Sequence, residues 1–239
     1  MTKTQKLFFS CVDSRIQDQG SMYARFHLGT FIQGQALTFA NALRRTLLSE
    51  IPGIIMTDIL VEGASHEFAI LPGVEETVLD IILNLKKLVF APSTSKLINL
   101  ENFQATGFLK SCGPRKLSGA DVKLPLTLKC VEPKAHIATI TNGAEFALRF
   151  NLELRNPQQS VTNKIYYPVE NKTRKLVLDN VPMPIQKVNY VIKALNGKQG
   201  LEYIVLEVWT DGSVLPQESV QFALKNLTNF FFQFAEMSK

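Results

Sequence analysis

The sequence predicts an α+β fold in which strand and helix segments at both ends of the chain flank a mostly β middle. Residues 5–33 are rich in aromatic residues and favour strands, and residues 35–51 have helical spacing. Residues 54–176 carry short apolar runs closed by glycine or proline, and residues 177–239 return to a strand–turn–helix pattern. The 239 residues, 46% hydrophobic and 20% charged, have a globular composition with room for one large domain or two small ones.

Charge and cysteine content restrict the function classes. A net charge of +5 and a pI near 9.1 are compatible with nucleic-acid contact, but the basic residues are scattered in pairs and form no basic arm. Three cysteines at long spacings predict neither a disulfide framework nor a zinc site, and they favour a reducing compartment. We expect no signal peptide, no transit peptide and no membrane span.

The first helix, over residues 35–51, follows the strand-like stretch "MYARFHLGTF" and ends at Pro52-Gly53. At about 100° per residue its side chains divide into two faces. The apolar face holds Ala36, Ala40, Leu43, Leu47 and Ile51, and the more polar face holds Thr38, Asn41, Arg45 and Leu48. Arg45 beside Leu48 is either a solvated arginine next to one exposed leucine or a contact patch for a partner, and Arg44 on the flank fits either role.

The middle of the chain contains one predicted helix among strands. "IIMTDILVEG" and "EFAILPG" are short strand-like runs, and "VEETVLDIILNLKKLVF" has helical spacing. The stretch "HIATITNGAEFALRFNLEL" predicts a β-hairpin, because Asn142-Gly143 is a favoured tight turn and the residues beyond it alternate. Residues 155–175 are polar and turn-rich and predict a loop.

The C-terminal helix carries more apolar surface than one packing face needs. It follows a strand that ends at Asp211-Gly212, and Pro216 and Glu218 suit its first turn. An apolar stripe of Val220, Leu224, Leu227, Phe231 and Phe234 is widened by Phe222, Phe230 and Phe232. The helix is therefore either buried centrally within one chain or paired with a second copy of itself.

No constellation of catalytic residues can be found in the sequence. The three histidines, His27, His66 and His136, are isolated and lack metal-ligand spacing. "LNGKQG" lacks the glycine-rich loop of a phosphate-binding site, and "GASHEF" lacks the second histidine of a helical zinc motif. The sequence therefore predicts no catalytic residues, no metal and no cofactor in this chain.

Four stretches, in order, resemble the amino-terminal domain of the α subunit of DNA-directed RNA polymerase: "ANALRRTLLSEIPG", "HEFAILPGVEETVLDIILNLKKLV", "HIATIT" and "LEVWTDGSVLPQESV". The resemblance implies a discontinuous dimerisation subdomain, residues 1–52 and 177–239, interrupted by a β-rich subdomain, residues 53–176. It implies a homodimer, formed largely through helices, on which the β and β′ subunits assemble. The active site and its Mg²⁺ would lie in another subunit, and DNA would be met only through the complex.

The resemblance also implies contact residues. The β subunit would meet Thr38, Asn41, Arg45, Leu48 and Ser49, and also His66, Glu67, Phe68, Pro72 and Gly73. The dimer interface would include Leu43, Leu47, Leu224, Leu227, Phe231 and Phe234. Residues 177–210 would lie toward β′ in the other copy.

Three features depart from the family pattern. Ala40 stands where a glycine is usual before "NALRR", and "RNPQQSVTNKIYY" replaces a more regular "RGRGY"-like stretch. We also expect this sequence to lack the small DNA- and activator-binding domain with which most family members continue. The wording "LEVWTDGS" is most similar to plastid and cyanobacterial members, which predicts a plastid location or, alternatively, a bacterial cytoplasm.

Three other hypotheses about the function of the chain remain open at this point. An independent nucleic-acid-binding protein would use the net charge of +5. A stand-alone enzyme would carry a site dispersed along the chain. A heterodimer subunit would pair its C-terminal helix with a different partner helix.

Overall fold

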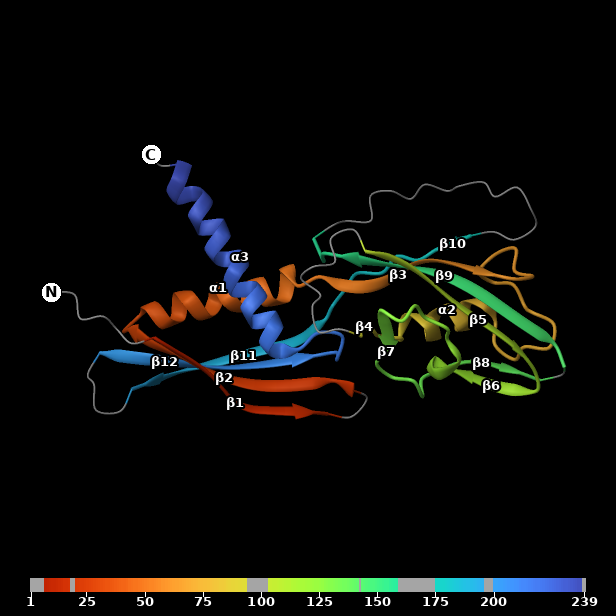
Figure 1. The fold of residues 1–239 in the computed structure, drawn as a ribbon, viewed down its shortest axis with the longest axis horizontal. Helices are drawn as coiled ribbons and strands as arrows, with labels where there is room; N and C mark the ends of the chain where they lie inside the picture. The colour runs from red at the N-terminus through yellow and green to blue at the C-terminus, as the bar shows by residue number, and fades with distance from the viewer. Residues whose placement is uncertain are drawn as a thin grey trace. The chain divides into compact units, whose positions relative to one another are not determined.

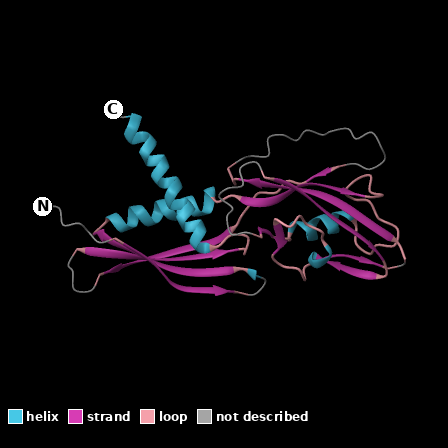
Figure 2. Cartoon of the chain, in the orientation of Figure 1, coloured by secondary structure: helices cyan, strands magenta, loops and turns pink. Residues whose placement is uncertain are grey.

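The computed structural model describes residues 7–17, 20–93, 103–141, 143–158, 175–195 and 200–237. The chain divides into two compact units. Unit 1 combines Met1–Ile51 with Met183–Lys239, and unit 2 is Pro52–Pro182. Both units contain helices and strands, as the predicted α+β class requires (Figure 2).

Unit 1 is a four-stranded antiparallel sheet with two helices on one face (Figure 1). The strand order is β1-β2-β12-β11, so segments from the two ends of the chain pair in the middle of the sheet. The strands are β1 (Phe8–Ile16), β2 (Met22–Ile32), β11 (Ile185–Ala194) and β12 (Leu201–Thr210), and the helices are α1 (Gln35–Glu50) and α3 (Pro216–Met237). The β2–β12 pairing explains how a discontinuous sequence forms one unit.

The alternation of side chains along the two central strands builds the core of unit 1. On β2 and β12 every second residue faces the helices, and the buried residues there are Ala24, Phe26, Leu28, Ile204, Leu206 and Val208. The matching residues of α1 are Ala36, Ala40, Leu43 and Leu47, with Ile51 directly after the helix. The apolar face predicted for this helix is therefore confirmed.

Unit 2 is built around α2 (Val78–Lys86) and a second four-stranded sheet of order β10-β3-β9-β5. The sheet strands are β3 (Gly53–Val61), β5 (Gln104–Cys112), β9 (Glu145–Arg155) and β10 (Leu176–Val177). Two small pairs complete the unit: β4 (Phe90–Pro92) with β7 (Leu128–Cys130), and β6 (Arg115–Ser118) with β8 (His136–Ile140). A single-turn 3₁₀ helix, Gly119–Asp121, follows β6.

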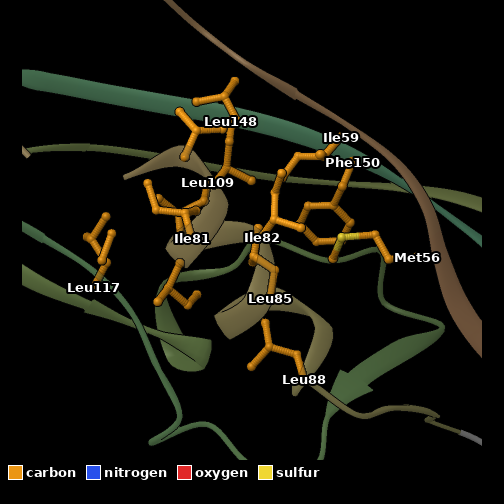
Figure 3. Packing of buried hydrophobic residues seen from close by; sticks show 14 of the residues in the cluster. Met56, Ile59, Ile81, Ile82, Leu85, Leu88, Leu109, Leu117, Leu148 and Phe150 are labelled. Carbon is orange, nitrogen blue, oxygen red and sulfur yellow. The ribbon is translucent and has the colours of Figure 1, made fainter. Parts of the chain in front are cut away.

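The apolar residues of α2 occupy the centre of unit 2. Figure 3 shows Ile81, Ile82 and Leu85 among Leu109 and Leu148 of the large sheet and Leu117 of β6. A capping box begins this helix, because the Thr77 hydroxyl accepts from the Asp80 amide and the Asp80 carboxylate accepts from the Thr77 amide. The helix predicted in "VEETVLDIILNLKKLVF" is confirmed, with its start fixed by this cap.

The hairpin predicted around Asn142-Gly143 is wrong. Strand β8 pairs with β6, whereas β9 pairs with β3 on one edge and β5 on the other. Both edges of β9 are therefore occupied, and β8 has no edge of β9 to join. The chain between them crosses from one sheet to another, and Asn142 itself lies outside the described residues.

The return from the inserted unit comes later than the expected residue 177. Val177 pairs with Asp58 of β3, and Leu178 belongs to the hydrophobic core of unit 2. The chain re-enters unit 1 at Met183. Most of the predicted 155–175 loop, residues 159–174, lies outside the described residues.

Candidate functional site

The face of α1 opposite its core face carries the first set of candidate contact residues. Thr38, Asn41, Arg45 and Leu48 are exposed and Ser49 is half-buried, as the helical spacing predicts. Leu48 keeps 40% of its surface exposed, so an apolar side chain stands beside the Arg45 guanidinium. The Arg45 guanidinium can bind a carboxylate or carbonyl of a partner while the same partner covers Leu48.

The two neighbouring arginines of α1 differ in their contacts within the unit. Arg44 donates from Nε to the backbone carbonyl of Val188 at 3.1 Å, so it ties α1 to strand β11 of its own unit. Arg45 has no side-chain hydrogen bond or ion pair with the described part of the chain. Asn41 accepts a hydrogen bond from the Tyr190 hydroxyl at 2.7 Å and is thereby partly engaged within the unit. Of the two, Arg44 is therefore the one whose side chain is engaged within unit 1.

Leu43 and Leu47 require a correction. Their exposed fractions are 0% and 1%, because both pack into the core of unit 1. A side chain with no exposed surface offers nothing to a second copy of the chain. We therefore assign these two leucines to the core of the unit and not to the dimer interface.

A loop between β3 and α2 carries the second set of candidate contact residues. We call residues 62–77 the presentation loop. His66, Glu67, Phe68 and Pro72 are exposed on it, and Gly73 is half-buried with a left-handed φ of 78°. Phe68 is 65% exposed and Ile70 is 78% exposed, whereas Leu71 and Val74 are buried in the core of unit 2. The loop is therefore anchored by two apolar side chains and displays two others.

Ile70 is a candidate that the sequence interpretation missed. It lies within the stretch "HEFAILPG", where the short apolar run predicts a strand with one buried face. The structure forms only an isolated bridge there, from Ile70 to Thr77, and Ile70 faces outward. The signal available in the sequence was a phenylalanine and an isoleucine within a segment bounded by Gly63 and Gly73.

The C-terminal half of α3 carries an exposed apolar surface of unit 1. Val220 and Ala223 are buried near the start of the helix, and Leu224 and Leu227 are half-buried. Every described residue from Thr228 onward is exposed, and Figure 1 shows this end of α3 extending past α1. The exposed apolar residues are Phe230, Phe231, Phe232, Phe234 and Met237, at 55%, 60%, 60%, 59% and 84%.

This exposure decides between the two readings of the C-terminal helix within one chain. Central burial is excluded for the second half, because unit 1 leaves four phenylalanines in solvent. Phe230 contacts Phe231 and Phe234 edge-on, with ring centroids 5.8 and 5.1 Å apart, so the rings form one patch. Patches of this kind on soluble proteins mark interaction sites.

The described residues contain no group of three or more histidine, cysteine or acidic side chains that could hold a metal ion. His27 packs against the Tyr203 ring at 5.5 Å, and His136 pairs with Glu76 at 2.8 Å. His66 is exposed, so the three histidines lie in three separate environments. No helix in the described ranges is long and apolar enough to cross a membrane.

The shifted pKa values belong to groups with structural partners. Burial raises the pKa of Asp211, although its carboxylate accepts from the Ser213 amide at 2.9 Å and from the Ser213 hydroxyl at 2.5 Å. Burial raises the pKa of Tyr23, whose hydroxyl donates to Glu207 at 2.7 Å. Neither group lies among the contact candidates, and both shifts have burial as their first cause.

Comparison with known proteins identifies the relatives of this chain. The sequence matches the RNA polymerase Rpb3/Rpb11 dimerisation domain over residues 30–231. It is 54% identical, over 275 aligned positions, to a DNA-directed RNA polymerase subunit alpha of Chlorella vulgaris, with 100% of this chain and 99% of the relative covered.

More distant relatives carry the same name. The chain is 36% identical to the subunit alpha of Chaetosphaeridium globosum, covering 92% of this chain and 63% of the relative. It is 35% identical to that of a Synechococcus strain, covering 95% of this chain and 66% of the relative. The chain thus spans somewhat less than two thirds of these two relatives. With its discontinuous sheet, its exposed terminal helix and these matches, the chain belongs to the family of DNA-directed RNA polymerase α subunits.

Proposed function

We propose that this chain is the homodimeric assembly platform of a DNA-directed RNA polymerase. The observation that carries the proposal is the exposed aromatic half of α3, from Phe230 to Phe234, which one copy of unit 1 cannot cover. A two-fold dimer uses the same patch twice and covers both copies. The candidate surfaces present an arginine and exposed apolar side chains, which suit contact with a partner, and we propose a non-catalytic role for this chain in a nucleotidyltransferase complex.

Two surfaces are proposed to receive the β subunit. The first is the Arg45–Leu48 face of α1, where an exposed guanidinium stands beside a leucine that is 40% exposed. The second is the presentation loop, which displays Phe68 and Ile70 on a base buried in unit 2. Residues 177–210 are proposed to lie toward β′ in the other copy, as the family resemblance implies.

The remaining assignments follow from the same resemblance. The Mg²⁺ of catalysis and the template DNA are proposed to bind other subunits of the assembled enzyme. We place the complex in the plastid, because relatives from algae such as Chlorella and Cyanidium are similar over nearly the whole chain. The Synechococcus relatives leave a bacterial cytoplasm as the alternative.

Arg45→Ala tests the β assignment. We expect the variant to keep its fold and its dimer, and to lose affinity for purified β subunit by on the order of tenfold or more, as interface arginines commonly do. Lys129→Ala is the matched control, because it also removes an exposed cation but lies on β7, outside both proposed surfaces. Unchanged capture of β by Arg45→Ala would contradict the assignment.

A further inference from the structure

Glu76 occupies an unusual place at the base of the presentation loop. Its carboxylate accepts three hydrogen bonds from strand β8: from the Thr139 amide at 2.6 Å, from the Thr139 hydroxyl at 3.0 Å and from the His136 ring at 2.8 Å. The side chain is 18% exposed, against 46% for His136. One loop carboxylate thus holds two residues of a neighbouring strand.

The backbone contacts show which edge of β8 the loop occupies. The Glu75 amide donates to the Thr139 carbonyl at 3.0 Å, and the Gly73 carbonyl accepts from the Thr141 amide at 2.9 Å and from the Thr141 hydroxyl at 3.1 Å. The other edge of β8 pairs with β6. The loop therefore serves as the second neighbour of β8, and the Thr139 amide has a side-chain carboxylate as its acceptor.

The same short segment connects to the displayed residues. Glu76 directly precedes Thr77, which caps α2 and bridges to Ile70. The Val78 amide donates to the Ala69 carbonyl at 3.1 Å, so the stretch that carries Phe68 and Ile70 folds back onto the start of α2. A shift of residues 73–77 along β8 would move this stretch with it.

Electrostatics explain why the acceptor is a carboxylate. Burial by itself would raise the pKa of Glu76, but the hydrogen bonds from Thr139 and His136 outweigh it and hold the pKa below its usual value. The charged form is the one that the three donors stabilise. Hydrogen bonds to an ionised acceptor are shorter and stronger than neutral ones, which suits a single side chain that anchors a loop.

We propose that Glu76 is a positioning residue for partner capture: through Thr139 and His136 it fixes the presentation loop in the shape that offers Phe68 and Ile70 to the β subunit. This inference rests on the proposed docking of β to the loop. Glu76 itself need not touch β, because its carboxylate is already occupied by β8.

The test is a double-mutant cycle on the full dimeric chain, with purified β subunit as the binding probe. Phe68→Ala removes a displayed side chain, and Glu76→Ala removes the anchor. We expect each to weaken β capture about tenfold, and the double variant to bind about as weakly as either single one, since a misplaced Phe68 contributes little. Glu76→Gln, which can still accept hydrogen bonds, should recover part of the loss.

Glu145→Ala is the matched control. It removes an exposed carboxylate of the same unit that also has a basic partner, Lys110, but lies on β9 outside both proposed surfaces, so capture of β should not change. Calorimetry of each variant checks that unit 2 still unfolds cooperatively. If Glu76→Ala fails to fold, His136→Ala removes one donor at a half-exposed side chain and should weaken capture in the same direction.

Three results would overturn the inference. A double variant about a hundredfold weaker than the parent would show that Glu76 and Phe68 act independently. Unchanged capture by Glu76→Ala, or by both Glu76→Gln and His136→Ala, together with weakened capture by Phe68→Ala would leave the docking loop standing and remove the positioning role. Unchanged capture by Phe68→Ala as well would show that the loop does not meet β, so this part of the proposed function would fail together with the inference.

Discussion

Phe231→Asp is expected to dissociate the proposed homodimer. Phe231 is 60% exposed in one copy. A phenylalanine offers about 200 Å² for burial, so about 120 Å² per copy remains for a partner to cover. At about 25 cal/mol per Å², full burial contributes about 3 kcal/mol per copy and about 6 kcal/mol per symmetric dimer. The loss of that term raises the dimer Kd by about ten-thousandfold, and burial of a carboxylate weakens the pair further.

Sedimentation equilibrium measures the effect directly. The parent chain should be dimeric at micromolar concentration and Phe231→Asp monomeric. Trp209, the single tryptophan of the sequence, lies on β12, so its fluorescence reports whether unit 1 stays folded. Asn229→Asp is the matched control, because it adds the same charge nearly isosterically on the roughly opposite side of α3. A dimeric Phe231→Asp, or an equal loss with Asn229→Asp, would refute the placement of Phe231 in the interface.

Three further predictions concern the two units separately. Arg44→Ala should destabilise unit 1 by about 1 kcal/mol, since it removes the donor to Val188, while Arg45→Ala should leave the Trp209 unfolding midpoint unchanged; equal effects of the two would contradict their separate roles. Leu47→Ala should cost about 2–5 kcal/mol, as expected for a core leucine, and a smaller loss together with weakened dimerisation would return Leu47 to the interface. Glu76→Gln should lower the calorimetric stability of unit 2 at neutral pH. The pKa of Glu76 is lower in the folded chain than in the unfolded chain, where it is about 4.3. The Glu76 charge therefore contributes fully to the stability of unit 2 above the unfolded pKa, and this contribution is lost as the pH falls through the folded pKa. The difference from the parent should therefore shrink below about pH 4, and a constant difference down to pH 2 would contradict the role of the charge.

Helical periodicity predicted the faces of α1 well, because one face must meet the sheet and the other must not. Arg45 and Leu48 are exposed and Ala40 and Leu43 are buried, as the spacing requires. The family resemblance also assigned Leu43 to the dimer interface. Burial in the core of unit 1 and a place in the dimer interface conflict for Leu43, because a side chain with no exposed surface cannot contact a second copy.

Pairing between distant strands could not be predicted from local pattern. The Asn142-Gly143 signal and the alternation of β9 favoured a hairpin, but β9 already has β3 and β5 on its two edges. A turn signal describes the residues that form it and says nothing of which strands compete for an edge. The pairing of β10 with β3 is of the same long-range kind. It keeps the chain in unit 2 beyond residue 177, so that the chain re-enters unit 1 only at Met183.

The roles of α3 and Glu76 also depend on information absent from the local sequence. A stripe of phenylalanines fits central burial and pairing with a partner equally well. The two are separated only by how far along α3 the rest of unit 1 covers the helix. A glutamate in a polar loop normally predicts a solvated charge. Glu76 instead meets Thr139 and His136, which lie about 60 residues further along the chain.

Native mass spectrometry of the tagged chain, purified from its source without crosslinking, tests the platform role most directly. The proposed function predicts one large assembly that contains two copies of this chain together with the two large polymerase subunits. A single copy in the assembly, with another protein in the place of the second, would replace the homodimer with a heterodimer. A chain that purifies without large subunits, or with nucleic acid alone, would contradict the platform role.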